Sequence, residues 1–307
     1  MLGAGANDRG DGHALGIVCV LLASILWGTT GTASALAGSV SPLAIGAASM
    51  GVGGVLLAAT SARQIAASSR LIAASWPLVV VGGAAVALYS VAFYTSMRMA
   101  GVAIGTAVSI GGAPVASAVI ERLLDNRRLT VQWASGAALG VAGAVLLSFA
   151  RGGAAGGEGA QTVVGVLLGV LAASTYAGYS WTSHRLMRLG VPSRASVGAT
   201  FAVAAVVLLA VLVTVGRPFL DSWTNLAVGA YLAAVPMFVG YLLFGWGLSR
   251  VASSTATTVS LAEPVVAAVL AVAVVGERLP WFGWLGMGLI VACLVALALP
   301  GRRRSAG

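Results

Sequence analysis

The stretch Ser253–Pro280, SSTATTVSLAEPVVAAVLAVAVVGERLP, decides the fold class of this 307-residue chain. Up to Val275 it carries one charge, Glu263, and at 1.5 Å rise per residue a helix of that length crosses a hydrocarbon core of roughly 30 Å. Pro264 follows at once, and a proline inside a helix leaves the carbonyl four residues earlier, here that of Ser260, without its partner. We therefore predict a membrane-spanning helix that breaks beside its only carboxylate.

Such a break is costly in lipid. An unsatisfied backbone group in hydrocarbon costs several kcal/mol, so irregular backbone is tolerated only inside protein or beside a water-filled cavity. We therefore expect the segment Ser253–Val275 to face a cavity.

The composition extends this prediction to the whole chain. Hydrophobic residues make up 59% of it and charged residues only 8%, against roughly 25% charged residues in soluble domains. This predicts an all-α polytopic membrane protein. The two cysteines, Cys19 and Cys293, lie inside apolar runs far apart in the sequence, so their spacing indicates neither a metal site nor a disulfide, and we expect no cofactor.

Ten apolar segments are long enough to be membrane-spanning helices. We place them at Leu15–Ala37, Pro42–Thr60, Leu71–Ser96, Val102–Leu124, Val131–Ala150, Thr162–Ser183, Ser193–Val215, Trp223–Leu248, Ser253–Val275 and Trp281–Leu299. Outside them lie a tail at 1–14, a Gly-rich linker at 151–161 and a basic tail at 300–307. The linker divides the chain into two five-helix units, 15–150 and 162–299.

The two units match at a constant offset of 150 positions. The matches are Ser24 with Ser174, Gly28 with Gly178, Pro42 with Pro192, Pro114 with Pro264, Arg128-Leu129 with Arg278-Leu279, and Gly136 with Gly286. Self-similarity of this kind is typical of transporters built from repeats. Because five is odd, the second repeat must cross the membrane in the opposite sense, which predicts inverted repeats.

The net charge of +9 is explained by arginines in the loops, so we predict no nucleic-acid partner. With a cytoplasmic N-terminus, the inside residues are Arg9, Arg63, Arg70, Arg122, Arg127, Arg128, Arg185, Arg188, Arg194, Arg250, Arg302, Arg303 and Arg304, and the outside ones are Arg98, Arg151, Arg217 and Arg278. This excess predicts that both termini are cytoplasmic and that the 151–161 linker is periplasmic.

The paired prolines and the turn Gly276-Glu277-Arg278-Leu279, in a ten-helix chain, resemble the EamA-type branch of the drug/metabolite transporter superfamily over residues 15–299. The first repeat departs from this pattern, with Ala113 where the second has Glu263. The resemblance implies a multi-pass carrier of the bacterial inner membrane, commonly an exporter of amino acids or related metabolites. It also implies a central cavity walled by the first, third, fourth, sixth, eighth and ninth helices.

Polar and aromatic residues on these helices are the candidate site. We predict that substrate is bound by Trp27, Tyr89, Tyr94, Thr106, Ser109, Tyr176, Tyr179, Ser180, Tyr241, Ser260 and Glu263, with hinges at Pro114 and Pro264. A buried tyrosine hydroxyl needs a partner that lipid cannot supply. The alternatives are that serine and threonine hydroxyls bond to their own helix, and that Tyr231 anchors the membrane interface.

The leading functional hypothesis is an alternating-access exporter of small amphipathic metabolites, in particular amino acids with aromatic or apolar side chains. The carbonyls of Ile110 and Ser260, freed by the two prolines, would accept from a substrate ammonium. Proton coupling, if present, is assigned to Glu263, whose alternative role is to cap the break. An exporter of drug-like or aromatic cations, an intramembrane enzyme and a non-transporting scaffold compete with this hypothesis. The protein is expected to be a monomer or a weak homodimer.

Overall fold

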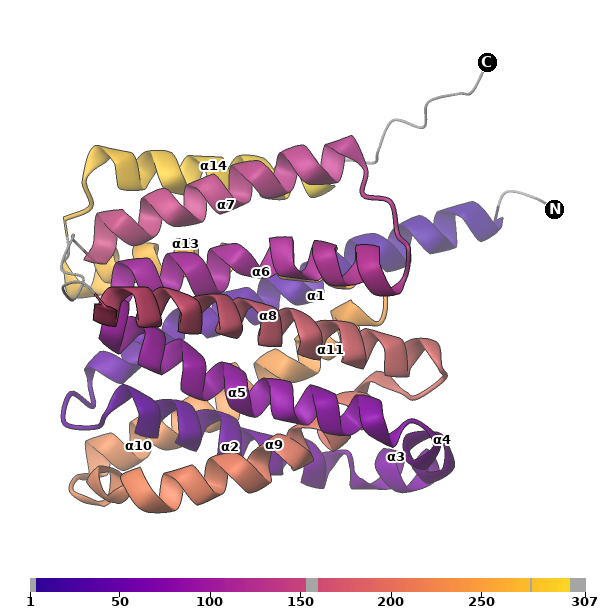
Figure 1. Cartoon of the computed structure of the whole chain (residues 1–307), viewed down its shortest axis with the longest axis horizontal. Coiled ribbons are helices and arrows are strands. Elements are labelled where there is room, and N and C mark those ends of the chain that lie inside the picture. Colours follow the sequence, from indigo (N-terminus) through magenta and orange to yellow (C-terminus); the bar gives the residue numbers. More distant parts are fainter. Residues whose placement is uncertain (1–3, 153–159, 277, 299–307) are drawn as a thin grey trace.

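The computed structural model of the protein describes residues 4–152, 160–276 and 278–298, and over these ranges it is built from helices without a strand (Figure 1). The predicted all-α architecture is confirmed. Residues 153–159 of the predicted linker, Glu277 of the Gly-Glu-Arg-Leu turn and the predicted tail at 300–307 lie outside the described residues.

The first half contains five long helices and two short ones. They are α1 (Ala4–Ala35), α2 (Pro42–Thr60), α3 (Ala62–Ala67), α4 (Ser69–Ala74), α5 (Trp76–Ala100), α6 (Val102–Leu124) and α7 (Val131–Gly152). The short helices α3 and α4 occupy the connection between α2 and α5.

The second half also makes five crossings, two of which are composite. It contains α8 (Ala160–Arg188), α9 (Ser193–Val215), η1 (Arg217–Leu220), α10 (Trp223–Leu232), η2 (Ala233–Val239), α11 (Gly240–Leu248), α12 (Ser253–Val259), α13 (Ala262–Leu270), η3 (Ala271–Val275) and α14 (Trp281–Ala298). One crossing is α10–η2–α11 and another is α12–α13–η3. Within the described ranges, nine crossings meet the length and hydropathy expected of a membrane span, and α14 is a slightly shorter apolar helix.

Two helix starts differ from the predictions by five residues or more. Helix α1 begins at Ala4, so residues 4–14 are largely helical rather than a tail, although its apolar span begins at Gly12. Helix α5 begins at Trp76, where the prediction was Leu71. Leu71 belongs to α4, which ends before Ser75, and hydropathy alone does not distinguish this apolar turn from the helix that follows.

The helix contacts agree with the inverted repeats. Equivalent helices pair with each other, α2 with α9 and α7 with α14, while α5 packs on α8 in the way that α11 packs on α1. Helix α1 begins at the end of the molecule where α14 finishes (Figure 1). An even number of crossings separates these two points, as ten crossings require.

Glycines bring α7 and α14 into backbone contact. A Cβ atom on Gly143 would lie 2.6 Å from the carbonyl oxygen of Gly286, and one on Gly286 would lie 2.7 Å from that of Gly143. Small residues allow membrane helices to approach this closely. The spacing Gly136-x3-Gly140 therefore serves packing within the chain, against Leu297 and Cys293 of α14.

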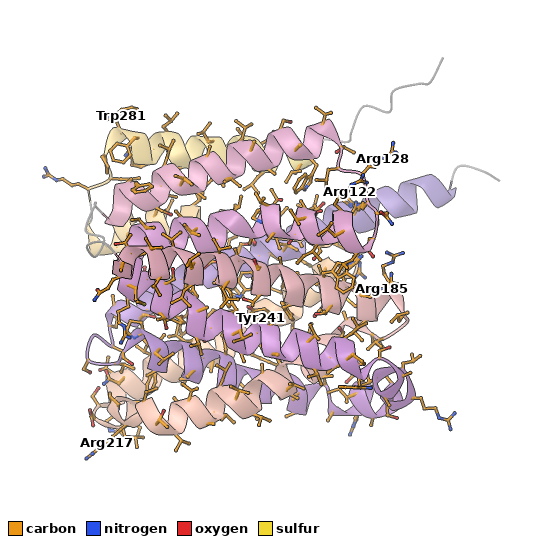
Figure 2. All side chains as sticks on the ribbon, in the orientation of Figure 1. Arg122, Arg128, Arg185, Arg217, Tyr241 and Trp281 are labelled. Atoms are coloured by element: carbon orange, nitrogen blue, oxygen red, sulfur yellow. The ribbon has the colours of Figure 1, made fainter. Side chains whose placement is uncertain are left out.

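Charged side chains distinguish the two ends of the bundle. Arg122, Arg128 and Arg185 lie at one end, whereas Arg217 and Trp281 lie at the other (Figure 2). We call the first the arginine-rich end and the second the opposite end. Helices α1, α5, α7, α9 and α12 begin at the arginine-rich end, and the helices that follow them return to it.

Candidate functional site

A small cavity lies inside the bundle. Its volume is about 60 Å³, and its walls come from α1, α2, α5, α6, α8, the α10–η2–α11 crossing and the broken α12–α13 crossing. The lining residues are Trp27, Thr30, Met50, Tyr89, Phe93, Tyr94, Ile110, Tyr176, Met237, Tyr241, Ser260 and Glu263. The crossing Ser253–Val275 faces a cavity, as its sequence predicted.

Most of the predicted site residues meet at this cavity. Those that line it are Trp27, Tyr89, Tyr94, Tyr176, Tyr241, Ser260 and Glu263. They come from both repeats and from five different crossings, so the fold brings together side chains up to 236 positions apart (263 − 27). Whether they bind a substrate remains a prediction.

Four predicted site residues lie off the cavity wall. On α6 the residue that faces the cavity is Ile110, so the wall is one position away from the predicted polar face. Ser109 and Ser180 are fully buried with no hydrogen-bond partner in the described part of the chain. The Thr106 hydroxyl instead contacts the Met97 sulfur at 3.5 Å.

Tyr179 lies behind the wall rather than in it. Its ring is 5.9 Å from that of Tyr241 and packs edge-on against Phe201 at 5.6 Å, measured between centroids. With 1% of its surface exposed, Tyr179 supports the cavity from outside. The prediction that it lines the cavity is therefore wrong in this conformation, because its helical face turns toward α9.

Five lining residues were not among the predicted site residues. Four of them lie on helices expected to wall the cavity, namely Thr30, Phe93, Ile110 and Met237, but Met50 belongs to α2, which was not among those helices. Apolar residues are so frequent in this chain that no local signal marks the ones that face the cavity.

The break in the second repeat lies at Ser260 and Leu261, between α12 and α13. The N–H of Glu263 donates to the carbonyl of Ser260 at 3.0 Å. The predicted free carbonyl at Ser260 is therefore wrong, because a tight turn satisfies it. Pro264 lies in the first turn of α13, where its missing N–H costs little.

The equivalent proline does not break its helix. Pro114 lies inside α6, which is continuous from Val102 to Leu124. The structure therefore contains one break where the sequence predicted two related hinges. The roles of Pro114 and Pro264 as moving points remain a proposal.

Hydrogen bonds fix the broken crossing and the tryptophan. The Tyr176 hydroxyl donates to Ser260 Oγ at 3.3 Å, and Ser260 in turn donates to the Thr257 carbonyl at 2.8 Å. Trp27 Nε1 donates to the carbonyl of Pro236 at 2.9 Å, inside the π-helix η2. Proline and π-helical turns both disturb regular helix bonding and free carbonyls of this kind, so Pro236 is a signal that the sequence offered for this contact.

The remaining polar groups of the cavity are unpaired. Among the described residues, the carboxylate of Glu263 has neither a hydrogen bond nor an ion pair, and no hydrogen bond reaches the hydroxyls of Tyr89, Tyr94 and Tyr241. The lining contains one carboxylate and no basic side chain. The site therefore offers one carboxyl group, several hydroxyls and a wall of aromatic rings.

Comparison with known proteins assigns the fold to a family. The model of the EamA-like transporter family matches residues 14–149 and 163–299, which are the two repeats. The chain belongs to the EamA-like transporter family. It is a multi-pass membrane transporter.

Relatives of this EamA-like transporter carry similar descriptions. The transporter YwfM of Bacillus subtilis strain 168 is 33% identical over 288 residues, covering 94% of this chain and 95% of YwfM. The inner membrane transporter YedA of Escherichia coli K12 is 26% identical over 197 residues, covering 63% and 61% of the two chains. A solved crystal structure superposes with a TM-score of 0.74 at 23% identity over 92% of this chain and 95% of its own, which supports the fold alone.

Proposed function

We propose that this EamA-like transporter exports small amphipathic metabolites that carry an amino group on a flat apolar body, amino acids with aromatic or apolar side chains first among them. It would do so by alternating access across the bacterial inner membrane, with the arginine-rich end in the cytoplasm. One observation carries the proposal. The cavity joins an unpaired carboxylate, Glu263, to a wall of aromatic rings.

The chemistry of the lining supports an ammonium ligand. A charged amine would pair with Glu263, and the faces of neighbouring rings would attract the same cation. The rings of Tyr89 and Tyr176 pack on each other at 5.6 Å, and those of Trp27 and Tyr241 at 5.0 Å, and all four residues line the cavity. An aromatic or branched apolar substrate would pack against these rings.

An amino acid also has a carboxylate that must be satisfied. The free hydroxyls of Tyr89, Tyr94 and Tyr241 are donors that would serve it. The hydroxyls would donate to the carboxylate of a zwitterion, and Glu263 would accept from its ammonium group.

The size of the cavity supports a conformational cycle. At about 60 Å³ it is well below the roughly 300–1,000 Å³ of ligand pockets. A substrate of the proposed class would enter only after the helices separate. The break at Ser260–Leu261 supplies a point where the wall would bend, with Pro264 and Pro114 as the proposed hinges.

Glu263 is also the residue proposed to carry a coupling proton. It is the only carboxylate in the lining, and removal from water disfavours the charged form of an unpaired carboxylate. Proton binding at Glu263 would then be linked to the same cavity that holds the substrate.

A second candidate is the export of drug-like or aromatic cations. The observation in its favour is that the lining has no basic side chain to pair with a substrate carboxylate. Cations without a carboxylate would need Glu263 and the rings but not the tyrosine hydroxyls.

Transport by purified protein in proteoliposomes tests both candidates. The matched substrates are phenylalanine and phenethylamine, which differ by the carboxylate alone, each assayed with and without a pH gradient. Amino-acid export predicts faster transport of phenylalanine, and cation export predicts the reverse. Transport of neither, or transport that Glu263→Gln leaves unchanged, would overturn the proposal, with Asp221→Asn, an exposed carboxylate at the opposite end, as the control.

A further inference from the structure

Two carboxylates at the end of α6 hold helices of the other repeat. Glu121 is 2% exposed and accepts three donors: the backbone N–H of Ser254 at 3.0 Å, the hydroxyl of Ser254 at 2.8 Å, and the guanidinium of Arg127 at 3.2 Å. Ser254 lies in the first turn of α12, in the second repeat. The contact therefore joins the repeats through a buried charged group.

The second carboxylate makes a parallel contact one turn further on. Asp125 accepts from the indole Nε1 of Trp181 at 2.8 Å and lies 3.6 Å from a guanidinium nitrogen of Arg185. Both partners lie on α8, also in the second repeat. We call Glu121 and Asp125, with Ser254, Trp181 and Arg185, the α6 latch.

The opposite end of the bundle has no comparable contact within the described residues. There the polar contacts between the repeats are neutral ones: Asn225 to Ser39 at 3.0 Å, Thr29 to Tyr231 at 2.9 Å, and the Ser96 hydroxyl to the Gly165 carbonyl at 2.7 Å. Both ion pairs that the described residues form involve the α6 carboxylates. Hydrogen bonds to charged groups are stronger than neutral ones, so the repeats are joined more firmly at the arginine-rich end.

The latch lies next to the movable part of the cavity wall. Helix α12 is held at its start by Glu121 and is separated at its end from α13, which carries Glu263, by the break at Ser260–Leu261. While the latch is made, α12 and α8 stay against α6. Release of the latch would free the start of α12 from α6, with the break at its other end.

We propose that the α6 latch is the gate that closes the cavity at the arginine-rich end, and that Glu121 and Asp125 control how often this end opens. They are positioning residues, because they act through α12 and α8 and touch no substrate. The inference rests on the alternating-access part of the proposed function and is independent of the substrate. A static role, in which the two carboxylates only stabilise the fold, makes a different prediction in the following experiment.

Two single-cysteine probes report the opening of each end, in a background without Cys19 and Cys293. Ser117, replaced by cysteine in the first probe, lies one turn before Glu121 on α6. Thr30, replaced in the second, lines the cavity near the C-terminal end of α1, toward the opposite end of the bundle. Neither native hydroxyl has a partner among the described residues, so the replacements break no hydrogen bond. In lipid nanodiscs both faces of the membrane meet the thiol reagent, so the readout needs neither a substrate nor a known orientation.

Opening of the gate predicts a reciprocal change in labelling. Glu121→Gln and Asp125→Asn should raise the labelling rate of Ser117→Cys roughly tenfold or more, as expected from losing hydrogen bonds to a charged group, and should lower that of Thr30→Cys. Ser254→Ala, a milder change, should move both rates in the same directions by less. Asp221→Asn removes an exposed carboxylate that forms neither a hydrogen bond nor an ion pair with the described residues, and it should change neither rate.

A loosened fold would raise labelling at both probes. An equal rise at the two positions, or no change at either in all three latch variants, would overturn the proposal. Because no substrate is present, reciprocal labelling would establish the gate even if neither phenylalanine nor phenethylamine were transported. Failure of the substrate assignment is thus distinguishable from failure of the gate.

Discussion

Helix α6 of the first repeat and the α12–α13–η3 crossing of the second occupy equivalent places, yet they are built differently. Helix α6 runs unbroken through Pro114, whereas its counterpart breaks at Ser260 and Leu261 just before Pro264. The continuous helix has its carboxylates at one end, Glu121 and Asp125, and the broken one has its carboxylate, Glu263, at the cavity.

The difference teaches that inverted repeats need not share a task equally. We infer that α6 serves as the fixed wall, because its carboxylates bond to residues of the other repeat. We infer that the broken crossing serves as the movable wall that meets the substrate. The two equivalent prolines have different effects on their helices. Pro264 lies in the first turn of a new helix, whereas Pro114 lies inside a continuous one.

The largest expected effect tests whether α6 and the α12–α13–η3 crossing run in opposite directions through the membrane. Val131 and Trp281 are equivalent residues, each opening the last helix of its repeat, and they are 85% and 76% exposed. In cells, Val131→Cys should react with a membrane-impermeant thiol reagent only from the cytoplasm, and Trp281→Cys only from outside. Labelling of both from one face would break the comparison.

The next prediction tests whether α6, the fixed wall, tolerates a carboxylate at the position equivalent to Glu263 of the movable wall. Ala113, the equivalent of Glu263, is 1% exposed. Ala113→Glu should lower the free energy of unfolding by about 2–5 kcal/mol, because it buries a polar group without a partner. Denaturation in detergent measures this, and Ala113→Met, of similar length without the charge, separates volume from polarity. Equal stability of the two variants would show that α6 has room for a polar group there.

Glu263→Gln tests the movable wall directly. If Glu263 pairs with a substrate amine, its loss should lower the transport rate at low substrate concentration roughly tenfold to a hundredfold, as expected from a hydrogen bond to a charged group worth about 1.5–3 kcal/mol. Reconstituted transport with and without a pH gradient is the measurement. Wild-type rates and wild-type dependence on the gradient would leave Glu263 with only a structural role at the break.

The smallest expected effect concerns the contact that holds the break. Tyr176→Phe removes the hydroxyl that donates to Ser260 but keeps the ring. A neutral hydrogen bond is worth about 0.5–1.5 kcal/mol, so transport should change only several-fold. Tyr179→Phe is the matched control for the bond to Ser260, since Tyr179 lies behind the cavity wall and its hydroxyl has no partner in the described structure. The same change in both variants would argue that the bond to Ser260 is irrelevant.

Hydropathy and the repeat pattern were sufficient to predict the crossings and their inverted order. A span is a local property, and a proline beside a lone carboxylate in an apolar run has few physical explanations other than a cavity. These features indicated Ser260 and Glu263 as cavity residues. The aromatics Trp27, Tyr89, Tyr94, Tyr176 and Tyr241 were predicted because they lie on helices that the family resemblance implied to wall the cavity.

Helix rotation and long-range pairing could not be predicted in this way. The difference between Ser109 and Ile110 as the lining residue of α6 is one position, about 100° of rotation, which packing decides and composition does not. Glu121 lies near the end of an apolar segment, where a carboxylate ordinarily meets water. Its partner Ser254 is 133 positions away, and no local pattern connects them.

The small volume of the cavity has a consequence for affinity. If only a fraction of the molecules has a cavity wide enough for substrate, the measured dissociation constant equals the intrinsic constant divided by that fraction. The concentration at which this protein saturates would then reflect the free energy of widening a space of about 60 Å³ as much as the chemistry of its walls. A rigid ligand that fits only the widened form would bind more tightly when that form is more populated. Its measured affinity would therefore report the position of the conformational equilibrium.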